Sequence, residues 1–230
     1  MSADQSLQVR KLGLCAYEPL FMRMREENIS NAALFQAQMP EQPHHCWLLQ
    51  HEAVFTQGLA GKPEHLLDAG NIPVVQIDRG GQITYHGPGQ LVCYLMLQLR
   101  ALNYGVKELV RRIEQAVIAL LADYQIDAFR VEGMPGVYVL KNVVQAKISA
   151  IGLRVAKHAT YHGLSINVAM DLQPFTRINP CGYEGLETAQ MTDFAGFVAS
   201  GDNVEVVGDK LTHHLNKILF STVLQNPKML

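Results

Sequence analysis

One short stretch constrains this chain more than any other: twelve residues that hold four glycines, a proline, an arginine and a histidine. It follows the apolar run Ile72–Ile77 and reads Arg79-Gly80-Gly81-Gln82-Ile83-Thr84-Tyr85-His86-Gly87-Pro88-Gly89-Gln90. An apolar run that ends in paired glycines predicts a strand leading into a loop, where glycine lets backbone amides approach a ligand closely. Gly87-Pro88-Gly89 predicts a rigid turn before a second strand over Leu91–Leu99. We therefore expect a loop built for contact with a ligand, because a plain turn would be filled with Asn, Asp or Ser.

Length and composition set the class of protein. With 230 residues, 48% of them hydrophobic, the chain can bury a substantial core, and we expect one domain over residues 1–230. The net charge of −2 argues against a general nucleic-acid or membrane-surface binder. The sequence has no run of about 18 apolar residues, so we expect no membrane span. Its first residues lack an apolar signal core, so we do not expect export. The four cysteines form no CxxC pair, which is typical of free thiols in a reducing cytoplasm: Cys15, Cys46, Cys93 and Cys181.

The hydrophobic pattern places strands in the middle of the chain and helices around them. Helical spacing predicts helices over Tyr17–Gln38 and Gly105–Gln125, the first with Leu20, Phe21, Met24 and Ile29 on its apolar side. Asn203 is the expected cap of a last helix. Strands are expected over Leu7–Leu12, Trp47–Gln50, Ala53–Thr56, Phe129–Val131, Val137–Leu140, Ala146–Val155 and Gly163–Val168. This order favours an α+β, mixed α/β fold over regular βαβ alternation.

Two residues stand out as carriers of chemistry. Cys181 lies between Pro180 and Gly182, in a loop where its side chain need not be packed. An ordinary thiol is only a few per cent thiolate at pH 7, so a catalytic cysteine needs a base or a cation beside it. Lys147 interrupts a strand of small and apolar residues, and it points either to solvent or into a cleft with a perturbed pKa. His86 and His162 are the other titratable candidates. His45 and Cys46 are poor joint metal ligands, because neighbours on a strand point to opposite faces.

The glycine-rich stretch, together with three later segments, resembles the signature of the lipoyl(octanoyl) transferases. The later segments follow in the order of that family and read Lys147–Val155, Tyr161–Asn167 and Asn179–Gly182. The resemblance covers roughly Gln50 to Phe194. It implies a fold similar to the catalytic domain of lipoate and biotin protein ligases, a mixed sheet flanked by helices that lie on one side of it.

The resemblance also implies an activity and its partners. The family moves an octanoyl group from octanoyl-acyl carrier protein to a lysine on lipoyl domains of 2-oxoacid dehydrogenases and on the glycine-cleavage H protein. It would make Cys181 the acyl-thioester nucleophile and Lys147 its partner, in a two-step route with no ATP, no cofactor and no metal. Backbone amides such as those of Gly80-Gly81 or Ile151-Gly152 would stabilise the oxyanion, and His86 and His162 would support the site. The acyl site would be lined by Arg79, Gly80, Gly81, Gln82, Ile83, Thr84, Tyr85, His86, Ala150, Ile151, Gly152, Gly163, Leu164 and Ser165.

Three alternatives stay open at this point. An ATP-dependent lipoate or biotin ligase on the same fold would not need Cys181, and a Cys-Lys thioesterase would deliver the acyl group to water. A catalytically silent module that binds lipoyl domains is disfavoured, because Cys181 and Lys147 are both present. Partners of this family are usually acidic, so the sequence also predicts a local basic surface, with Lys107, Arg111, Arg112, Arg154 and Lys157 as candidates.

Overall fold

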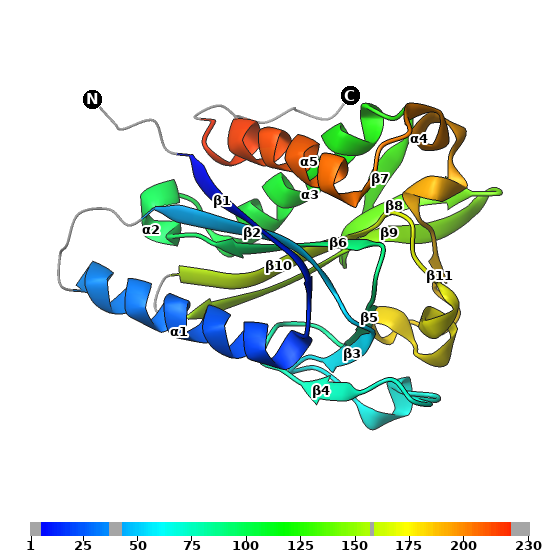
Figure 1. Ribbon diagram of the computed structural model, residues 1–230, viewed down its shortest axis with the longest axis horizontal. Coiled ribbons are helices and arrows are strands. Elements are labelled where there is room, and N and C mark those ends of the chain that lie inside the picture. Colours follow the sequence, from blue (N-terminus) through cyan, green and yellow to red (C-terminus); the bar gives the residue numbers. More distant parts are fainter. Residues whose placement is uncertain (1–5, 37–42, 157–158, 222–230) are drawn as a thin grey trace.

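The computed structural model describes residues 6–36, 43–156 and 159–221, and its centre is a mixed β-sheet of eight strands (Figure 1). The strand order is β1-β2-β6-β10-β9-β8-β7, with β11 beside β9. β1 pairs with β2, and β11 with β9, in parallel, whereas the other neighbours are antiparallel. The strands are β1 (Leu7–Cys15), β2 (His44–His51), β6 (Gln90–Met96), β7 (Ala128–Val131), β8 (Met134–Lys141), β9 (Val144–Ala156), β10 (Ala159–Asn167) and β11 (Glu187–Thr188).

A second sheet of three strands lies below the first in Figure 1 and carries the glycine-rich stretch. β3 (Val54–Gln57) is its central strand, with β4 (Val74–Gln76) parallel on one side and β5 (Ile83–His86) antiparallel on the other. The turn predicted at Gly87-Pro88-Gly89 is confirmed, because the Gln90 amide donates to the Gly87 carbonyl at 3.2 Å and β6 begins there.

Helices cover both faces of the large sheet. Along β6, Leu91, Cys93 and Leu95 face the core under α3 and α5. The residues between and after them, Val92, Tyr94 and Met96, face α1. A strand buried on both faces explains why this segment is an almost unbroken apolar run. The mixed fold flanked by helices is confirmed, but helices lie on both sides of the sheet rather than on one. The helices are α1 (Tyr17–Gln36), α2 (Leu99–Leu102), α3 (Val106–Ala122), α4 (Ala195–Ser200) and α5 (Val204–Leu219).

Helix α1 packs as predicted through Leu20 and Met24, but it departs from the prediction at Ile29. Leu20 and Met24 are buried against the sheet, but Ile29 is 54% exposed and the neighbouring Asn28 is buried in its place. Asn28 donates through Nδ2 to the Thr160 carbonyl at 3.0 Å, so a polar contact anchors this turn of the helix. Within the described part of the chain, none of the helices combines the length and the apolar character needed to cross a membrane.

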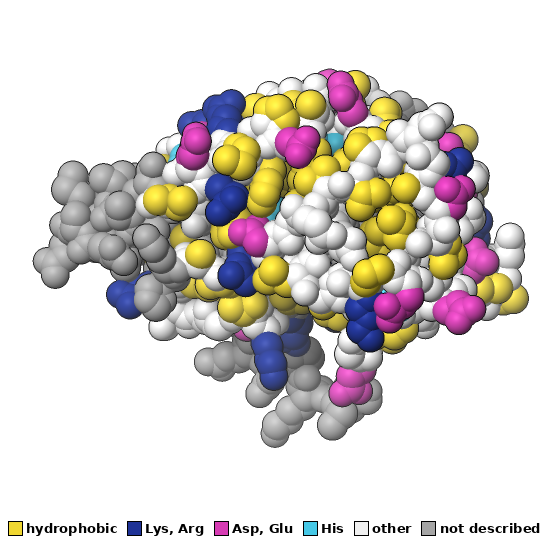
Figure 2. Space-filling model, turned by 90° about the horizontal axis from the view of Figure 1, so that it is seen from below, with side chains coloured by type: hydrophobic (Ala, Val, Ile, Leu, Met, Phe, Trp, Pro, Cys, Tyr) yellow, Lys and Arg dark blue, Asp and Glu magenta, His cyan; other side chains and the backbone are white. Residues whose placement is uncertain are grey.

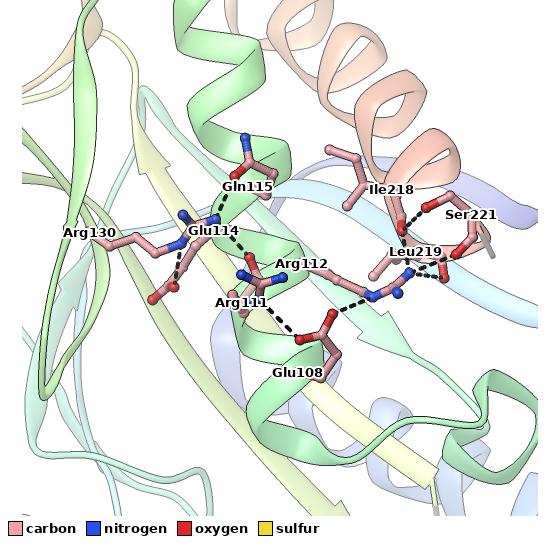
Figure 3. Close-up of polar contacts among 9 residues, drawn as sticks. All are labelled: Glu108, Arg111, Arg112, Glu114, Gln115, Arg130, Ile218, Leu219 and Ser221. Atoms are coloured by element: carbon pink, nitrogen blue, oxygen red, sulfur yellow. Dashed lines mark hydrogen bonds and ion pairs between the residues drawn. The ribbon is translucent and has the colours of Figure 1, made fainter. Parts of the chain in front are cut away.

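One residue of the basic surface predicted to dock a partner is internal. Arg112 is 7% exposed and donates to the carbonyls of Ile218, Leu219 and Ser221, so it satisfies the C-terminal end of α5 (Figure 3). The prediction of a docking role for Arg112 is therefore wrong, and Lys157 lies outside the described residues. Arg111 is paired with Glu108 at 3.1 Å. Figure 2 views the face that carries α1 and β4, and there Lys and Arg side chains are interspersed with Asp and Glu.

Candidate active site

Cys181 occupies a strained turn. It lies in a 3₁₀ turn, Pro180–Gly182, with a backbone φ of 58°, a left-handed conformation that residues other than glycine adopt rarely. The turn is tied down at both ends, because the Gly182 amide donates to the Asn179 carbonyl at 2.9 Å and the Asn179 amide donates to the His65 carbonyl at 2.8 Å. Strained backbone of this kind is concentrated at functional sites.

Lys147 is turned toward the same place by an irregularity in the sheet. On β9, Lys147 pairs with Tyr138 and Ser149 pairs with Val137, so Ile148 is an extra residue relative to β8. Ile148 is packed in the core under α3, and Lys147 points to the opposite face with only 5% of its surface exposed. Of the two placements that the sequence left open, the structure has the cleft rather than solvent.

The two side chains meet in space although 34 residues separate them in sequence. The Lys147 Nζ donates to the Cys181 Sγ at 3.0 Å and to the Pro135 carbonyl at 3.1 Å. The same Nζ lies 5.1 Å from the centre of the Tyr138 ring. Burial lowers the pKa of Lys147, but the charge and hydrogen bond of Cys181, together with those of Tyr138, outweigh burial, so this pKa is raised overall. The geometry therefore places the Lys147 ammonium in direct contact with the Cys181 sulfur.

The pair opens into a cavity of about 340 Å³ between the two sheets. With one exception, every residue predicted for the acyl site lines it. The exception is Tyr85, whose ring packs against Phe55 and Phe175 with centroids 5.6 and 5.5 Å away. His162 lines the cavity as well. Residues that the sequence reasoning missed also line it: Tyr17, Val92, Tyr94, Val106, Val110, Met134, Pro135, Leu153 and Tyr183.

Arg79 brings a buried positive charge to the cavity. Its guanidinium donates to the carbonyl and hydroxyl of Thr56, at 2.8 and 3.1 Å, and to the Gly80 carbonyl at 2.9 Å. Burial lowers its pKa, and the negative charge of Cys181 is among the groups that act against this. Among the described residues no carboxylate forms an ion pair with Arg79. This leaves its charge free to act on an anion formed in the cavity.

The glycines of the motifs are needed for close packing as well as for backbone shape. A Cβ at Gly152 would lie 2.8 Å from the Arg79 Cδ, and a Cβ at Gly163 would lie 2.0 Å from the Cys93 carbonyl oxygen. These two glycines face each other across β9 and β10. One predicted oxyanion donor is already engaged, because the Gly80 amide donates to the Leu153 carbonyl at 3.2 Å.

The histidines of the cavity are buried and neutral. Burial lowers the pKa of His86 to about 3, and its Nδ1 is hydrogen-bonded to Gln90 Oε1 at 2.6 Å. Burial also lowers the pKa of His162, although Asp78 lies 3.2 Å from its Nε2 and acts in the opposite direction. His162 is stacked on Phe21 with centroids 5.4 Å apart. Neutral imidazoles can accept or donate a hydrogen bond here but add no charge. Within the described residues no group of three His, Cys, Asp or Glu side chains is placed to hold a metal ion.

Comparison with solved structures places the fold. A bipartite lipoate protein ligase from Thermoplasma acidophilum, described with its E2 lipoyl domain, superposes with a TM-score of 0.66 at 17% identity, covering 94% of this chain and 84% of that one. A lipoate-protein ligase A bound with ATP gives a TM-score of 0.64 at 16% identity, with 94% and 85% covered. At such identities the likeness extends to the fold alone.

Comparison of sequences places the family. The octanoyltransferase of Laribacter hongkongensis is 51% identical over 209 residues, which cover 91% of this chain and 94% of that protein. The octanoyltransferase of Pseudomonas putida is 50% identical over 210 residues, with 91% and 93% covered. A family model described as the lipoyl protein ligase A/B catalytic domain matches residues 26–216. Since half-identical relatives and the family model both extend over most of its length, the chain belongs to the octanoyltransferases of the lipoyl protein ligase A/B catalytic domain family.

Proposed function

We propose that this enzyme transfers an octanoyl group from octanoyl-acyl carrier protein to a lysine of a lipoyl domain, through a thioester on Cys181. The observation that carries the proposal is the 3.0 Å contact between Lys147 Nζ and Cys181 Sγ at the edge of a cavity lined by the family's motif residues. The half-identical octanoyltransferases support the acyl group and the reaction type. Acceptors of the lipoyl-domain class fit the same family.

The first step forms the acyl-enzyme. The Cys181 thiolate attacks the thioester carbonyl of the donor, and a new carbon–sulfur bond to Cys181 replaces the bond to the carrier thiol. The departing carrier sulfur takes a proton from the Lys147 ammonium, which leaves Lys147 as a neutral amine. The Arg79 charge, which has no carboxylate partner among the described residues, stabilises the oxyanion that develops on the way.

The second step regenerates the pair. A free lysine has a pKa near 10.4 and attacks poorly at neutral pH, so the acceptor amine needs a base as its nitrogen becomes bonded to the acyl carbon. The acceptor ammonium loses one proton to solvent, and neutral Lys147 takes the second as the nitrogen bonds to the acyl carbon. The bond between that carbon and the Cys181 sulfur breaks, the amide forms, and Cys181 leaves as the thiolate. Both residues return to their starting states, so the cycle consumes no ATP and requires no cofactor or metal.

The apolar walls of the cavity suit a saturated acyl chain such as the octanoyl group. Apolar side chains such as Val92, Val110 and Leu164 contribute to its walls, and each methylene that leaves water for such a wall gains about 0.8 kcal/mol. His86 and His162, neutral and held by Gln90 and Asp78, support its shape. The cytoplasm fits this role, since all four cysteines are free thiols. We extend the proposal to residues 1–230 acting as one catalytic domain.

Intact mass spectrometry tests the proposal. The purified enzyme is mixed briefly with octanoyl-acyl carrier protein in the absence of ATP, beside the Cys181→Ser variant. We expect one octanoyl adduct on the wild type alone, and we expect an apo lipoyl domain to remove it while gaining the same mass. Modification of the lipoyl domain that requires free octanoic acid and ATP would instead identify a ligase. Release of free octanoate with no modified domain would identify a thioesterase.

A further inference from the structure

Glu114 is a buried carboxylate that the proposed reaction leaves unused. It lies on α3, 7% exposed, and both of its oxygens are engaged by other elements. Oε1 accepts from the Gly136 amide at 3.0 Å, and Oε2 accepts from the Arg130 Nε at 3.1 Å. Arg130 also donates to the Arg111 carbonyl and to Gln115, which holds its guanidinium beside Glu114 (Figure 3).

The Gly136 amide belongs to the peptide group that holds Lys147. The N–H of Gly136 and the carbonyl of Pro135 are the two ends of one peptide unit, and no peptide bond among the described residues is cis. Glu114 accepts from one end at 3.0 Å while the Lys147 Nζ donates to the other at 3.1 Å. Carboxylate, peptide and ammonium therefore form a single chain of hydrogen bonds, in which each bond polarises the next.

The peptide needs such an anchor because residue 136 is glycine. Its φ of 126° is open to glycine alone, and a Cβ there would lie 2.6 Å from the Ser149 carbonyl oxygen and 3.1 Å from the Lys147 Cε. Glycine lets Lys147 pack against the backbone, but it also lets the preceding peptide rotate. A rotated peptide would turn its N–H toward the ammonium, and the carboxylate of Glu114 opposes that rotation.

We infer that Glu114 is a positioning residue for the Lys147–Cys181 pair, acting through the Pro135–Gly136 peptide. The inference rests on the proposed function of that pair. Two other groups face Lys147 directly: Cys181 on its turn and Tyr138 on β8. The third contact of the ammonium is the Pro135 carbonyl, and Glu114 holds the peptide group to which that carbonyl belongs. Arg130 faces Glu114 but has no contact with Lys147.

The test measures the thiolate itself, separately from acyl transfer. Cys181 is alkylated with iodoacetamide over a range of pH, and the modified peptide is quantified by mass spectrometry. In Glu114→Ala we expect Cys181 alkylation at pH 7 to be about tenfold slower, because the lost bond orients a charged group. Glu114→Gln retains an acceptor for the Gly136 amide, so we expect partial rescue. Cys15, which lies at the end of β1 and is partly exposed, is the control thiol within each sample.

Two matched variants separate positioning from general stability. Glu108→Ala removes another carboxylate of α3 that binds arginines but is not linked to Lys147, and we expect wild-type alkylation of Cys181. Arg130→Ala removes the other partner of Glu114, and we expect lower thermal stability with a near-normal alkylation rate. If Arg130→Ala and Glu114→Ala slow the alkylation of Cys181 equally at matched stability, the inference is overturned. A wild-type dependence of the alkylation rate on pH in Glu114→Ala would overturn it as well. If the wild type forms no octanoyl adduct, the proposed function fails, while the alkylation series still decides the role of Glu114.

Discussion

Lys147 holds its charge in a place where a lysine would ordinarily lose it. Burial alone lowers a lysine pKa, but Cys181, 3.0 Å away, and Tyr138 together reverse the direction. The same contact sets an ammonium beside the sulfur that we propose as the nucleophile. Removing one partner changes the charge beside the other, and the mechanism that we propose requires both.

We predict that Lys147→Ala folds normally and forms the acyl-enzyme at least about a hundredfold more slowly, the ordinary size of a general acid–base contribution. The deletion leaves no uncompensated buried charge, because a cysteine without a cation beside it is an uncharged thiol, so we expect the fold to be retained. Single-turnover mass spectrometry gives the rate, and thermal melting gives the stability. Lys141→Ala is the matched control, since Lys141 ends the neighbouring strand β8 and pairs with Asp193. Undiminished acyl-enzyme formation in Lys147→Ala would remove the pair from the mechanism.

At the scale of residues, the sequence identified the candidates better than their environment. Cys181 was recognisable because proline and glycine flank it, which indicates a loop. Lys147 could point to solvent or into a cleft, and the choice was made by the extra residue Ile148 on β9, which no local pattern reveals. Glu114 is not among the residues predicted from the sequence, because its partners, the Arg130 side chain and the Gly136 amide, come from the next hairpin.

At the scale of elements, the N-terminal cap of α5 is a local sequence signal that fixes where the helix begins. Asn203 precedes the helix, and its Oδ1 accepts from the amides of Glu205 and Val206 at 3.0 and 3.1 Å, which confirms the predicted cap. We predict that Asn203→Ala lowers the free energy of unfolding by about 1 kcal/mol, measured by urea denaturation. Acyl transfer should stay unchanged, because no residue of α5 lines the cavity. Asn203→Ser keeps a hydrogen-bond acceptor, so its free energy of unfolding should stay within about 0.5 kcal/mol of the wild type. An equal loss of stability in both variants would contradict the capping role.

Elements that depend on distant partners were harder to predict. The strand expected to continue to Leu99 ends at Met96, and α2 begins at Leu99. β5 lies inside a stretch with the composition of a loop, and it is a strand because β3 supplies its hydrogen-bond partners. β11 has two residues and exists only through its pairing with β9. Long periodic segments such as α3 carry their own signal, and short edge segments do not.

At the scale of the whole molecule, buried neutral histidines link the cavity to stability in acid. Burial lowers the pKa of His51 to about 4 and that of His86 to about 3, and the rings lie 5.9 Å apart. His51 is further held by the Tyr94 hydroxyl at 2.7 Å. An unfolded histidine titrates near 6.5, so the unfolded chain binds these protons first as the pH falls. The stabilisation is complete above pH 6.5 and is lost as the pH falls toward 4 for His51 and toward 3 for His86.

We predict that the free energy of unfolding falls by about 1.4 kcal/mol per pH unit for each of these two histidines over the part of that window where only the unfolded state is protonated. Urea denaturation at pH 7, 6, 5 and 4.5 measures the slope, and the double variant His51→Gln, His86→Gln should have a shallower one. Some slope should remain, because burial also lowers the pKa of His162 and His45. His213→Gln changes an exposed histidine of α5 and is the matched control, expected to keep the wild-type slope. A double variant that loses stability in acid as steeply as the wild type would show that carboxylates, rather than these histidines, govern the acid limit of the fold.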